Sequence, residues 1–122
     1  MRGVASGRCV DIPGSNTTPG TQLIIWDCHG GANQTWQFHG GTVRALGACM
    51  TAATGTDLTP ITISTCTGAA TQKWTYEPTT KRLRNDPSGK CLDVNGGATD
   101  NNSKIVLYSC HTGTNQQWTL PS

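Results

Sequence analysis

The chain is poor in charged and aromatic residues and has no long apolar run. Of its 122 residues, 13% are charged and 6% are aromatic, and the formal net charge is only +2. The nine lysines and arginines are spread along the chain, so they form no basic patch of the kind that binds nucleic acid. The longest apolar runs, Leu23–Trp26 and Ile105–Tyr108, have the length of a strand and not of a membrane span. We therefore expect neither nucleic acid nor a membrane as a partner.

Threonine, glycine, serine, asparagine and proline together make up 55 of the 122 residues. This mixture disfavours helix and favours short strands joined by turns. Because 34% of the residues are hydrophobic and the net charge is low, the composition is not that of a disordered chain. A chain of this length forms one domain and buries about two thirds of the surface that its unfolded form exposes. The sequence thus predicts a single all-β domain over residues 1–122.

The six cysteines fall into three pairs with similar spacing. The pairs are Cys9 and Cys28, Cys49 and Cys66, and Cys91 and Cys110, with separations of 19, 17 and 19 residues. Each pair recurs in the same local setting, so we predict these three disulfides among the fifteen connectivities open to six cysteines. A zinc site would need close doublets such as C-x-x-C, which the sequence lacks, and we expect no metal and no cofactor. Disulfides in a small, loop-rich domain predict a secreted, extracellular protein.

A threefold repeat runs through the whole chain. The first cysteine of each pair stands at positions 9, 49 and 91, and a tryptophan that ends each unit stands at positions 36, 74 and 118. Each unit contains about four short segments of strand composition, separated by turns rich in Gly, Pro and Asn. A unit of about forty residues cannot bury its own apolar face, whereas three units can close around a pseudo-threefold axis. We predict a β-trefoil with repeats at about 1–39, 40–78 and 79–122, called the first, second and third repeat below.

Three glutamine–x–tryptophan motifs, Gln34–Trp36, Gln72–Trp74 and Gln116–Trp118, stand in phase with the three cysteine pairs. With the Cys-Val-Asp and Cys-Leu-Asp openings and the Trp-Asp-Cys and Tyr-Ser-Cys strand ends, they resemble the ricin-type β-trefoil lectin domain over essentially the whole chain. The resemblance is closest to the carbohydrate-binding modules of this type on bacterial xylanases, galactanases and arabinofuranosidases. Because the motif tryptophan occurs once per repeat in an unvarying frame, we expect these three tryptophans in the core.

A pocket for a pyranose needs a flat apolar surface for the C–H face of the ring and polar groups for its hydroxyls. Two repeats offer equivalent candidate sets: Asp11, Trp26, Asn33 and Gln34 in the first, and Asp93, Tyr108, Asn115 and Gln116 in the third. The resemblance implies that the aspartate accepts hydrogen bonds from ring hydroxyls, that the aromatic ring stacks and that the asparagine completes the hydrogen bonding. It also implies that the glutamines orient the aspartates. His29 and His111, which follow the second cysteine of their pairs, are further candidate sugar contacts.

The second repeat departs from this pattern at every critical position. Thr51 stands where the aspartate belongs, Ser64 where the aromatic residue belongs and Thr71 where the asparagine belongs, while the glutamine and tryptophan of the motif remain. A core position seldom accepts serine in place of tryptophan, which favours a ligand role for the two aromatic counterparts. We therefore predict that the second repeat is structural and that two working pockets lie about 20–25 Å apart.

The acids of the chain are poorly suited to hydrolysis. Glycoside hydrolases use two carboxyl groups about 5–10 Å apart, whereas Glu77 is the sole glutamate here and Asp11 and Asp93 are symmetry mates too distant to cooperate. The cysteines are used in disulfides, and no serine lies in a nucleophile-elbow context. The sequence therefore predicts that the domain is not an enzyme.

We predict a non-catalytic carbohydrate-binding module for plant or microbial polysaccharide, with xylan or galactose-configured glycans favoured and β-1,3-glucan and arabinan left open. Its expected partners are that polysaccharide or oligosaccharide and a linked catalytic domain of a secreted glycoside hydrolase, and we expect a monomer. No signal peptide follows Met1, so we expect a module of a longer secreted protein or a mature chain without its leader. The residues leave open a free-standing secreted lectin for cell-surface glycans and a trefoil scaffold that binds only protein.

Overall fold

The structure, a computed structural model, describes residues 1–120 and consists there of twelve short strands and five single-turn 3₁₀ helices. The strands are β1 (Arg2–Gly3), β2 (Cys9–Asp11), β3 (Ile24–Trp26), β4 (Gln37–His39), β5 (Thr42–Ala45), β6 (Ala48–Ala52), β7 (Ile61–Thr65), β8 (Trp74–Glu77), β9 (Arg82–Asn85), β10 (Cys91–Val94), β11 (Ile105–Tyr108) and β12 (Trp118–Thr119). The 3₁₀ helices are η1 (Pro13–Ser15), η2 (Ala32–Gln34), η3 (Ala70–Gln72), η4 (Asn95–Gly97) and η5 (Thr114–Gln116). The all-β class predicted from composition is confirmed. The predicted third repeat ends in Pro121 and Ser122, which lie outside the described residues.

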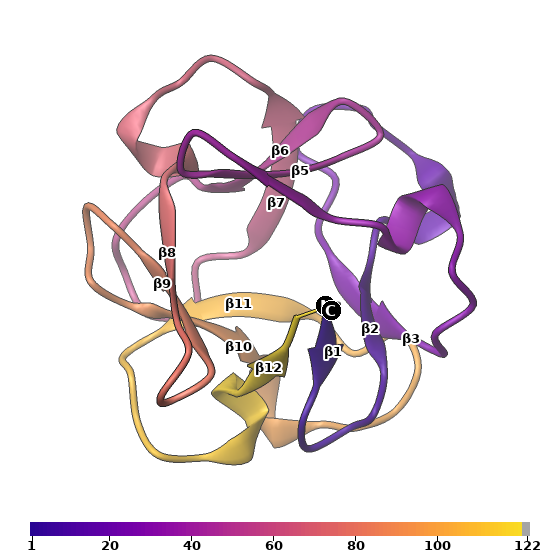
Figure 1. Cartoon of the computed structure of the whole chain (residues 1–122), viewed down its shortest axis with the longest axis vertical. Helices are drawn as coiled ribbons and strands as arrows, with labels where there is room; N and C mark the ends of the chain where they lie inside the picture. Colours follow the sequence, from indigo (N-terminus) through magenta and orange to yellow (C-terminus); the bar gives the residue numbers. More distant parts are fainter. Residues whose placement is uncertain (121–122) are drawn as a thin grey trace.

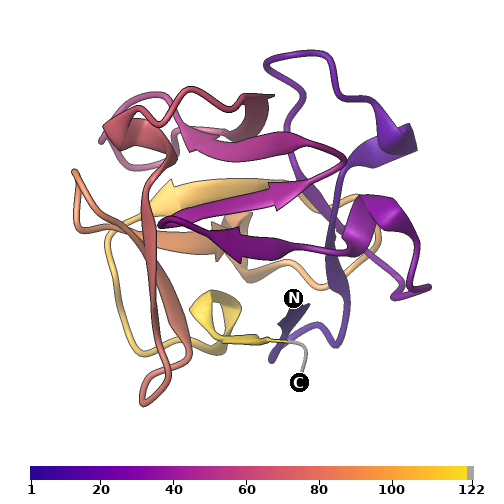
Figure 2. The same cartoon turned by 45° about the horizontal axis from the view of Figure 1, so that its top comes forward.

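The strands form three antiparallel four-stranded sheets arranged around a central axis (Figure 1). Their orders are β12-β1-β2-β3, β4-β5-β6-β7 and β8-β9-β10-β11. The strand that ends each sequence repeat pairs with the strand that opens the next: β4 with β5, β8 with β9 and β12 with β1. Because β12 pairs with β1, the last described strand lies beside the first in both views (Figures 1 and 2). The β-trefoil prediction is confirmed.

The tryptophans of the three glutamine–x–tryptophan motifs lie in the core, as predicted. Trp36, Trp74 and Trp118 are buried and belong to the single hydrophobic cluster that the described residues form. Each indole Nε1 donates a hydrogen bond to a carbonyl oxygen of the second strand of its own repeat, at 2.9, 3.0 and 3.1 Å respectively. A buried indole N–H without a partner would cost free energy, so this bond fixes where each ring lies.

The three predicted disulfides are present, and their Cα atoms are 5.1 Å apart in each case. In the chain-entropy model each loop contributes about 3 kcal/mol to the free energy of unfolding. The first cysteine of a pair lies two residues before a candidate aspartate, and the second lies one residue before a candidate histidine in the first and third repeats. The bridge therefore joins the two segments that carry the candidate site. No helix within residues 1–120 is long and apolar enough to span a membrane.

Candidate functional site

The strand registers place the candidate residues of the three repeats at equivalent points. The position of the aromatic residue lies opposite the first cysteine of each pair: Trp26 opposite Cys9, Ser64 opposite Cys49 and Tyr108 opposite Cys91. Two residues beyond each of these cysteines stand the aspartates of the first and third repeats and Thr51 of the second. Ser64 and Thr51 are thus the spatial counterparts of a ring and a carboxylate, as the repeat alignment predicts.

In the first repeat, Asp11, Trp26, His29 and Asn33 line one pocket of about 280 Å³. Its remaining walls are Pro13 and Gly14 of η1, Ile24 of β3, and Asn102 from the third repeat. The Trp26 side chain is 41% exposed, in contrast to the three buried tryptophans of the core. An exposed indole beside a buried carboxylate is a surface on which a sugar ring can stack.

In the third repeat, the equivalent residues Asp93, Tyr108, His111 and Asn115 line a larger pocket of about 490 Å³. Residues 95–97 of η4 and Leu58, which comes from the second repeat, complete this pocket. The Tyr108 side chain is 37% exposed. The structure thus brings together both predicted sets, and the candidate histidines join them.

The two aspartates are buried and held by the glutamines of the motif. Gln34 Nε2 donates to Asp11 Oδ2, and Gln116 Nε2 donates to Asp93 Oδ2, both at 2.8 Å. Each glutamine also accepts a hydrogen bond from the backbone N–H of the candidate histidine, at 2.9 and 2.8 Å. Both glutamines are buried and do not line the pockets, so they orient the carboxylates from behind. An ionised carboxylate has about four acceptor positions. The positions that the glutamine does not use can accept hydrogen bonds from a ligand.

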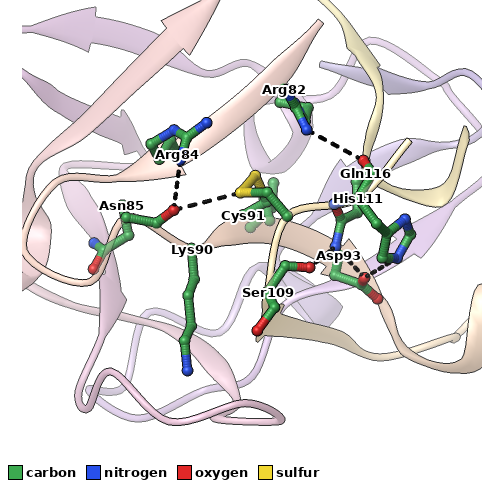
Figure 3. Close-up of a disulfide and its surroundings, with 12 residues drawn as sticks. Arg82, Arg84, Asn85, Lys90, Cys91, Asp93, Ser109, His111 and Gln116 are labelled. Carbon is green, nitrogen blue, oxygen red and sulfur yellow. Dashed lines mark hydrogen bonds and ion pairs between the residues drawn. A yellow bond between two sulfur atoms is a disulfide. The ribbon is translucent and has the colours of Figure 1, made fainter. Parts of the chain in front are cut away.

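The candidate histidines point their Nε2 atoms at the carboxylates, as Figure 3 shows for His111 and Asp93. His29 Nε2 lies 3.7 Å from Asp11 Oδ2, and His111 Nε2 lies 3.6 Å from Asp93 Oδ2. Both distances exceed that of a direct hydrogen bond. Each Nδ1 accepts a hydrogen bond from a backbone N–H two residues on, at 3.0 Å from Gly31 and 2.9 Å from Gly113. Each ring is therefore fixed with Nε2 facing the pocket.

Two glycines make room for these rings, and sequence reasoning missed both. A Cβ atom on Gly113 would lie 2.6 Å from His111 Cε1 and 2.7 Å from Asn115 Oδ1, and Gly31 is crowded in the same way. The backbone φ of Gly113 is −66°, which any residue adopts, so the need for glycine is spatial. The second repeat, which has Thr67 in place of the histidine, has Ala69 at this position. Comparing the repeats position by position would have revealed this linked change.

We expect Gly113→Ala to displace His111 from Asp93 and to weaken binding in the third-repeat pocket several-fold. The backbone there suits alanine, so the free energy of unfolding should change by less than about 1 kcal/mol. Sugar titration, together with the NMR shifts of the His111 ring, measures both effects. The matched control is Ala69→Gly at the equivalent point of the second repeat, which should leave binding unchanged; an unmoved ring in Gly113→Ala would contradict the steric argument.

Burial raises the pKa of Asp93 above the usual range of an aspartate. Hydrogen bonding from Gln116 and Asn115 and the charge of His111 oppose this rise, and Asp57 adds to it. The carboxylate accepts hydrogen bonds best when ionised, so affinity at this pocket should fall as the pH drops through the raised pKa. The effect of Asp93 on folding has the opposite sign, because a raised pKa favours folding below the unfolded-state pKa and loses that contribution as the pH rises.

We expect binding in the third-repeat pocket to weaken toward a limiting slope of about tenfold per pH unit below this pKa. The measurement is sugar titration between pH 7 and pH 4 with an Asp11→Ala variant, in which the third-repeat pocket is the one carrying a carboxylate. Asp93→Asn should bind more weakly at pH 7 and show little pH dependence. An unchanged pH profile in Asp93→Asn would show that Asp93 is not the group responsible for the effect.

Among residues 1–120, no cluster of three or more His, Cys, Asp or Glu side chains is placed to hold a metal ion. The sequence of this chain matches the ricin-type β-trefoil lectin domain over residues 1–118. The chain belongs to this family. It is a family of carbohydrate-binding, non-catalytic domains, and the fold and the three disulfides agree with it.

Relatives of this lectin domain include large proteins of which it matches a small part. A glucan endo-1,3-beta-glucosidase of Cellulosimicrobium cellulans is 45% identical over 98 residues, or 78% of this chain and 18% of that protein. Serine protease 1 of Rarobacter faecitabidus is 36% identical over 126 residues, or 91% of this chain and 21% of that protein. The chain spans between 9% and 21% of the length of such relatives. The C-half of the earthworm R-type lectin, solved in complex with GalNAc, shares the fold with a TM-score of 0.82 at 21% identity, covering 95% of this chain and 91% of that one.

Proposed function

We propose that this lectin domain binds carbohydrate through two pockets, one in the first repeat and one in the third, and catalyses no reaction itself. One observation carries the proposal. An aspartate, an exposed aromatic ring, a histidine and an asparagine line a pocket in both repeats, whereas the second repeat has lost all four and kept its glutamine and tryptophan. The buried glutamine and tryptophan recur three times, which supports a role in ligand binding for the four residues that recur twice.

The chemistry of the set fits the two faces of a pyranose. The C–H face stacks on Trp26 or Tyr108, which contributes about 0.5–1.5 kcal/mol beyond area burial. Vicinal hydroxyls donate to the buried carboxylate, and each such charge-assisted bond contributes about 1.5–3 kcal/mol. The asparagine amide donates one N–H to a backbone carbonyl, at 3.1 Å from Asn33 to Ile12 and 3.3 Å from Asn115 to Val94, which orients it beside the hydroxyls. We expect dissociation constants of about 0.1–1 mM for such open pockets, which correspond to a binding free energy of about 4–5.5 kcal/mol.

The ligand that we propose is a polysaccharide or oligosaccharide, with galactose-configured glycans or xylan favoured. The galactose configuration is supported by the shared fold of the earthworm lectin that was solved with GalNAc. β-1,3-Glucan is the alternative supported by the relative named as a glucan endo-1,3-beta-glucosidase. Arabinan is a further candidate from the family resemblance.

We propose that the natural role of the domain is to hold a linked, secreted enzyme at its polysaccharide substrate. The two bacterial relatives support this role, because each is named as an enzyme and the matching region is about a fifth of its length. The disulfides support secretion. A free-standing, monomeric lectin is the second candidate, and the chain covers 91% of the solved C-half of a lectin from earthworm.

Calorimetric titration with galactose, lactose, xylose and laminaribiose, followed by retention on insoluble xylan, galactan, arabinan and β-1,3-glucan, tests the proposal. We expect at least one sugar to bind at two sites per chain in the millimolar range or tighter. If no sugar gives a heat of binding and no polymer retains the domain, the proposal is contradicted. Such a result would favour a scaffold that binds protein.

A further inference from the structure

Each repeat sends a loop over the next repeat, and two of the three loops supply a wall of a candidate pocket. The loops are anchored by backbone hydrogen bonds from Gly20 N to Ile63 O (2.9 Å), from Leu58 N to Leu107 O (2.7 Å) and from Asn102 N to Ile25 O (2.9 Å). The three donor residues are equivalent and have φ values of 93°, 71° and 73°. Leu58 of the second repeat thereby lines the third-repeat pocket, and Asn102 of the third repeat lines the first-repeat pocket.

Leu58 is an unusual residue for this position. Left-handed backbone is tolerated by glycine and asparagine, which stand at the two equivalent positions, and is strained for a branched side chain such as leucine. Leu58 is also 56% exposed, the highest value among the large apolar side chains of residues 1–120. The exposed Leu58 side chain adds little to the buried core, and backbone strain of this kind often occurs at functional sites.

A polar latch holds the Leu58 loop in place. Asp57 Oδ1 accepts hydrogen bonds from Ser109 N at 2.8 Å and Ser109 Oγ at 2.9 Å, and lies 3.2 Å from Lys90 Nζ. These hydrogen bonds and the charge of Lys90 lower the pKa of Asp57, so the latch is ionised at neutral pH. Ser109 directly follows Tyr108, and the latch therefore ties the loop to the strand end that carries the aromatic ring.

The same latch exists at the first-repeat pocket with other residues. Asn101 Oδ1 accepts hydrogen bonds from Asp27 N at 2.8 Å and from Arg8 Nε at 2.7 Å. At the equivalent points around the second repeat stand Pro19 and Ala48, whose side chains have no polar atom. The latch is thus found where the aspartate, ring and asparagine are found, which connects the loop with ligand binding and not with folding alone.

We propose that Leu58 is an apolar ligand contact of the third-repeat pocket, a second apolar wall besides Tyr108. This inference rests on the proposed function and gives the two pockets different ligand ranges. The third-repeat pocket prefers a sugar that carries a large apolar group next to the stacked ring, such as an aryl aglycone. The first-repeat pocket, with Asn102 in that place, lacks this preference. The second repeat, predicted to be structural, then contributes to a binding site through its loop.

Matched glycosides test the preference. In an Asp11→Ala background, where the third-repeat pocket dominates binding, we expect phenyl β-D-galactopyranoside to bind at least threefold more tightly than its methyl counterpart. Leu58→Asn copies the residue of the first-repeat pocket and should bring the ratio close to one, because the phenyl group loses its apolar contact. The reciprocal variant Asn102→Leu, in an Asp93→Ala background, should create the preference in the first-repeat pocket. The same comparison with methyl and phenyl β-D-xylopyranoside covers the xylan alternative.

Thermal unfolding separates a ligand contact from a structural residue. Because asparagine tolerates the left-handed backbone, Leu58→Asn should unfold at the same temperature as the parent or at a higher one. A lowered unfolding temperature, or a phenyl preference that survives in Leu58→Asn, would overturn the inference while leaving the proposed function intact. If the parent chain binds neither the two galactosides nor the two xylosides, the proposed function is wrong for these sugars. This inference would then be wrong as well.

Discussion

Replacing Asp11 and Asp93 together by threonine is expected to abolish retention on polysaccharide while leaving the fold intact. Threonine is the residue that the second repeat carries at this position, where Gln72 Nε2 donates to Thr51 Oγ1 at 3.3 Å. The glutamines of the other repeats would therefore keep a partner. Loss of one charge-assisted hydrogen bond of about 1.5–3 kcal/mol weakens a pocket by about 10–150-fold. Starting from millimolar affinity, neither pocket would then hold the domain on a polymer.

Affinity electrophoresis or pull-down on the insoluble polysaccharide that the parent binds measures this loss, with circular dichroism as the check on folding. The single variant Asp11→Thr should leave monosaccharide binding in the third-repeat pocket unchanged. Its polymer retention should nevertheless fall by more than half, because two pockets on one rigid body gain avidity that one pocket cannot provide. Thr51→Ala is the matched control and should behave as the parent. Normal retention of the double variant would show that these aspartates are not ligands.

Trp118→Ala is expected to lower the free energy of unfolding by about 3–5 kcal/mol, whereas Trp26→Ser should change it by about 1 kcal/mol or less. Trp118 is fully buried in the core and bonded to Leu92 O, while Trp26 is substantially exposed in its pocket. Trp26→Ser reproduces Ser64 of the second repeat. It should remove sugar binding from the first-repeat pocket, because the stacking surface is gone.

Urea denaturation gives the stability difference between these variants, and sugar titration in an Asp93→Ala background isolates the first-repeat pocket. The opposite pattern, with a strongly destabilised Trp26→Ser and a folded, stable Trp118→Ala, would exchange the roles that we give the two tryptophans. Equal destabilisation by both would mean that Trp26 is a core residue whose exposure has no bearing on binding.

Most of the fold could be predicted because the same residue pattern recurs in three repeats of the sequence. The threefold fold was predicted from the spacing of Cys9, Cys49 and Cys91 and from the three glutamine–x–tryptophan motifs. The disulfides were predicted because each cysteine pair recurs in the same local sequence. The assembly of two candidate pockets followed from comparing intact repeats with the altered second one. These features depend on residues close to one another in the same repeat, where sequence order and spatial order agree.

The contributions that cross between repeats were out of reach of this reasoning. Leu58 and Asn102 belong to one repeat and line the pocket of the next, and the sequence does not state which loop reaches which neighbour. The left-handed backbone of Leu58 is likewise imposed by its anchor to Leu107 and by the latch of Asp57, both long-range contacts. Gly113 was missed for another reason. A side chain at this position would collide with the His111 ring, and the sequence does not show where that ring lies.

A crystal structure of the domain soaked with an oligosaccharide that it binds will show whether the two pockets hold the sugar. We predict sugar density stacked on Trp26 and on Tyr108, with ring hydroxyls within hydrogen-bond distance of Asp11 and Asp93, and none at Ser64. Sugar bound beside Ser64, with open solvent over both aromatic rings, would contradict the account.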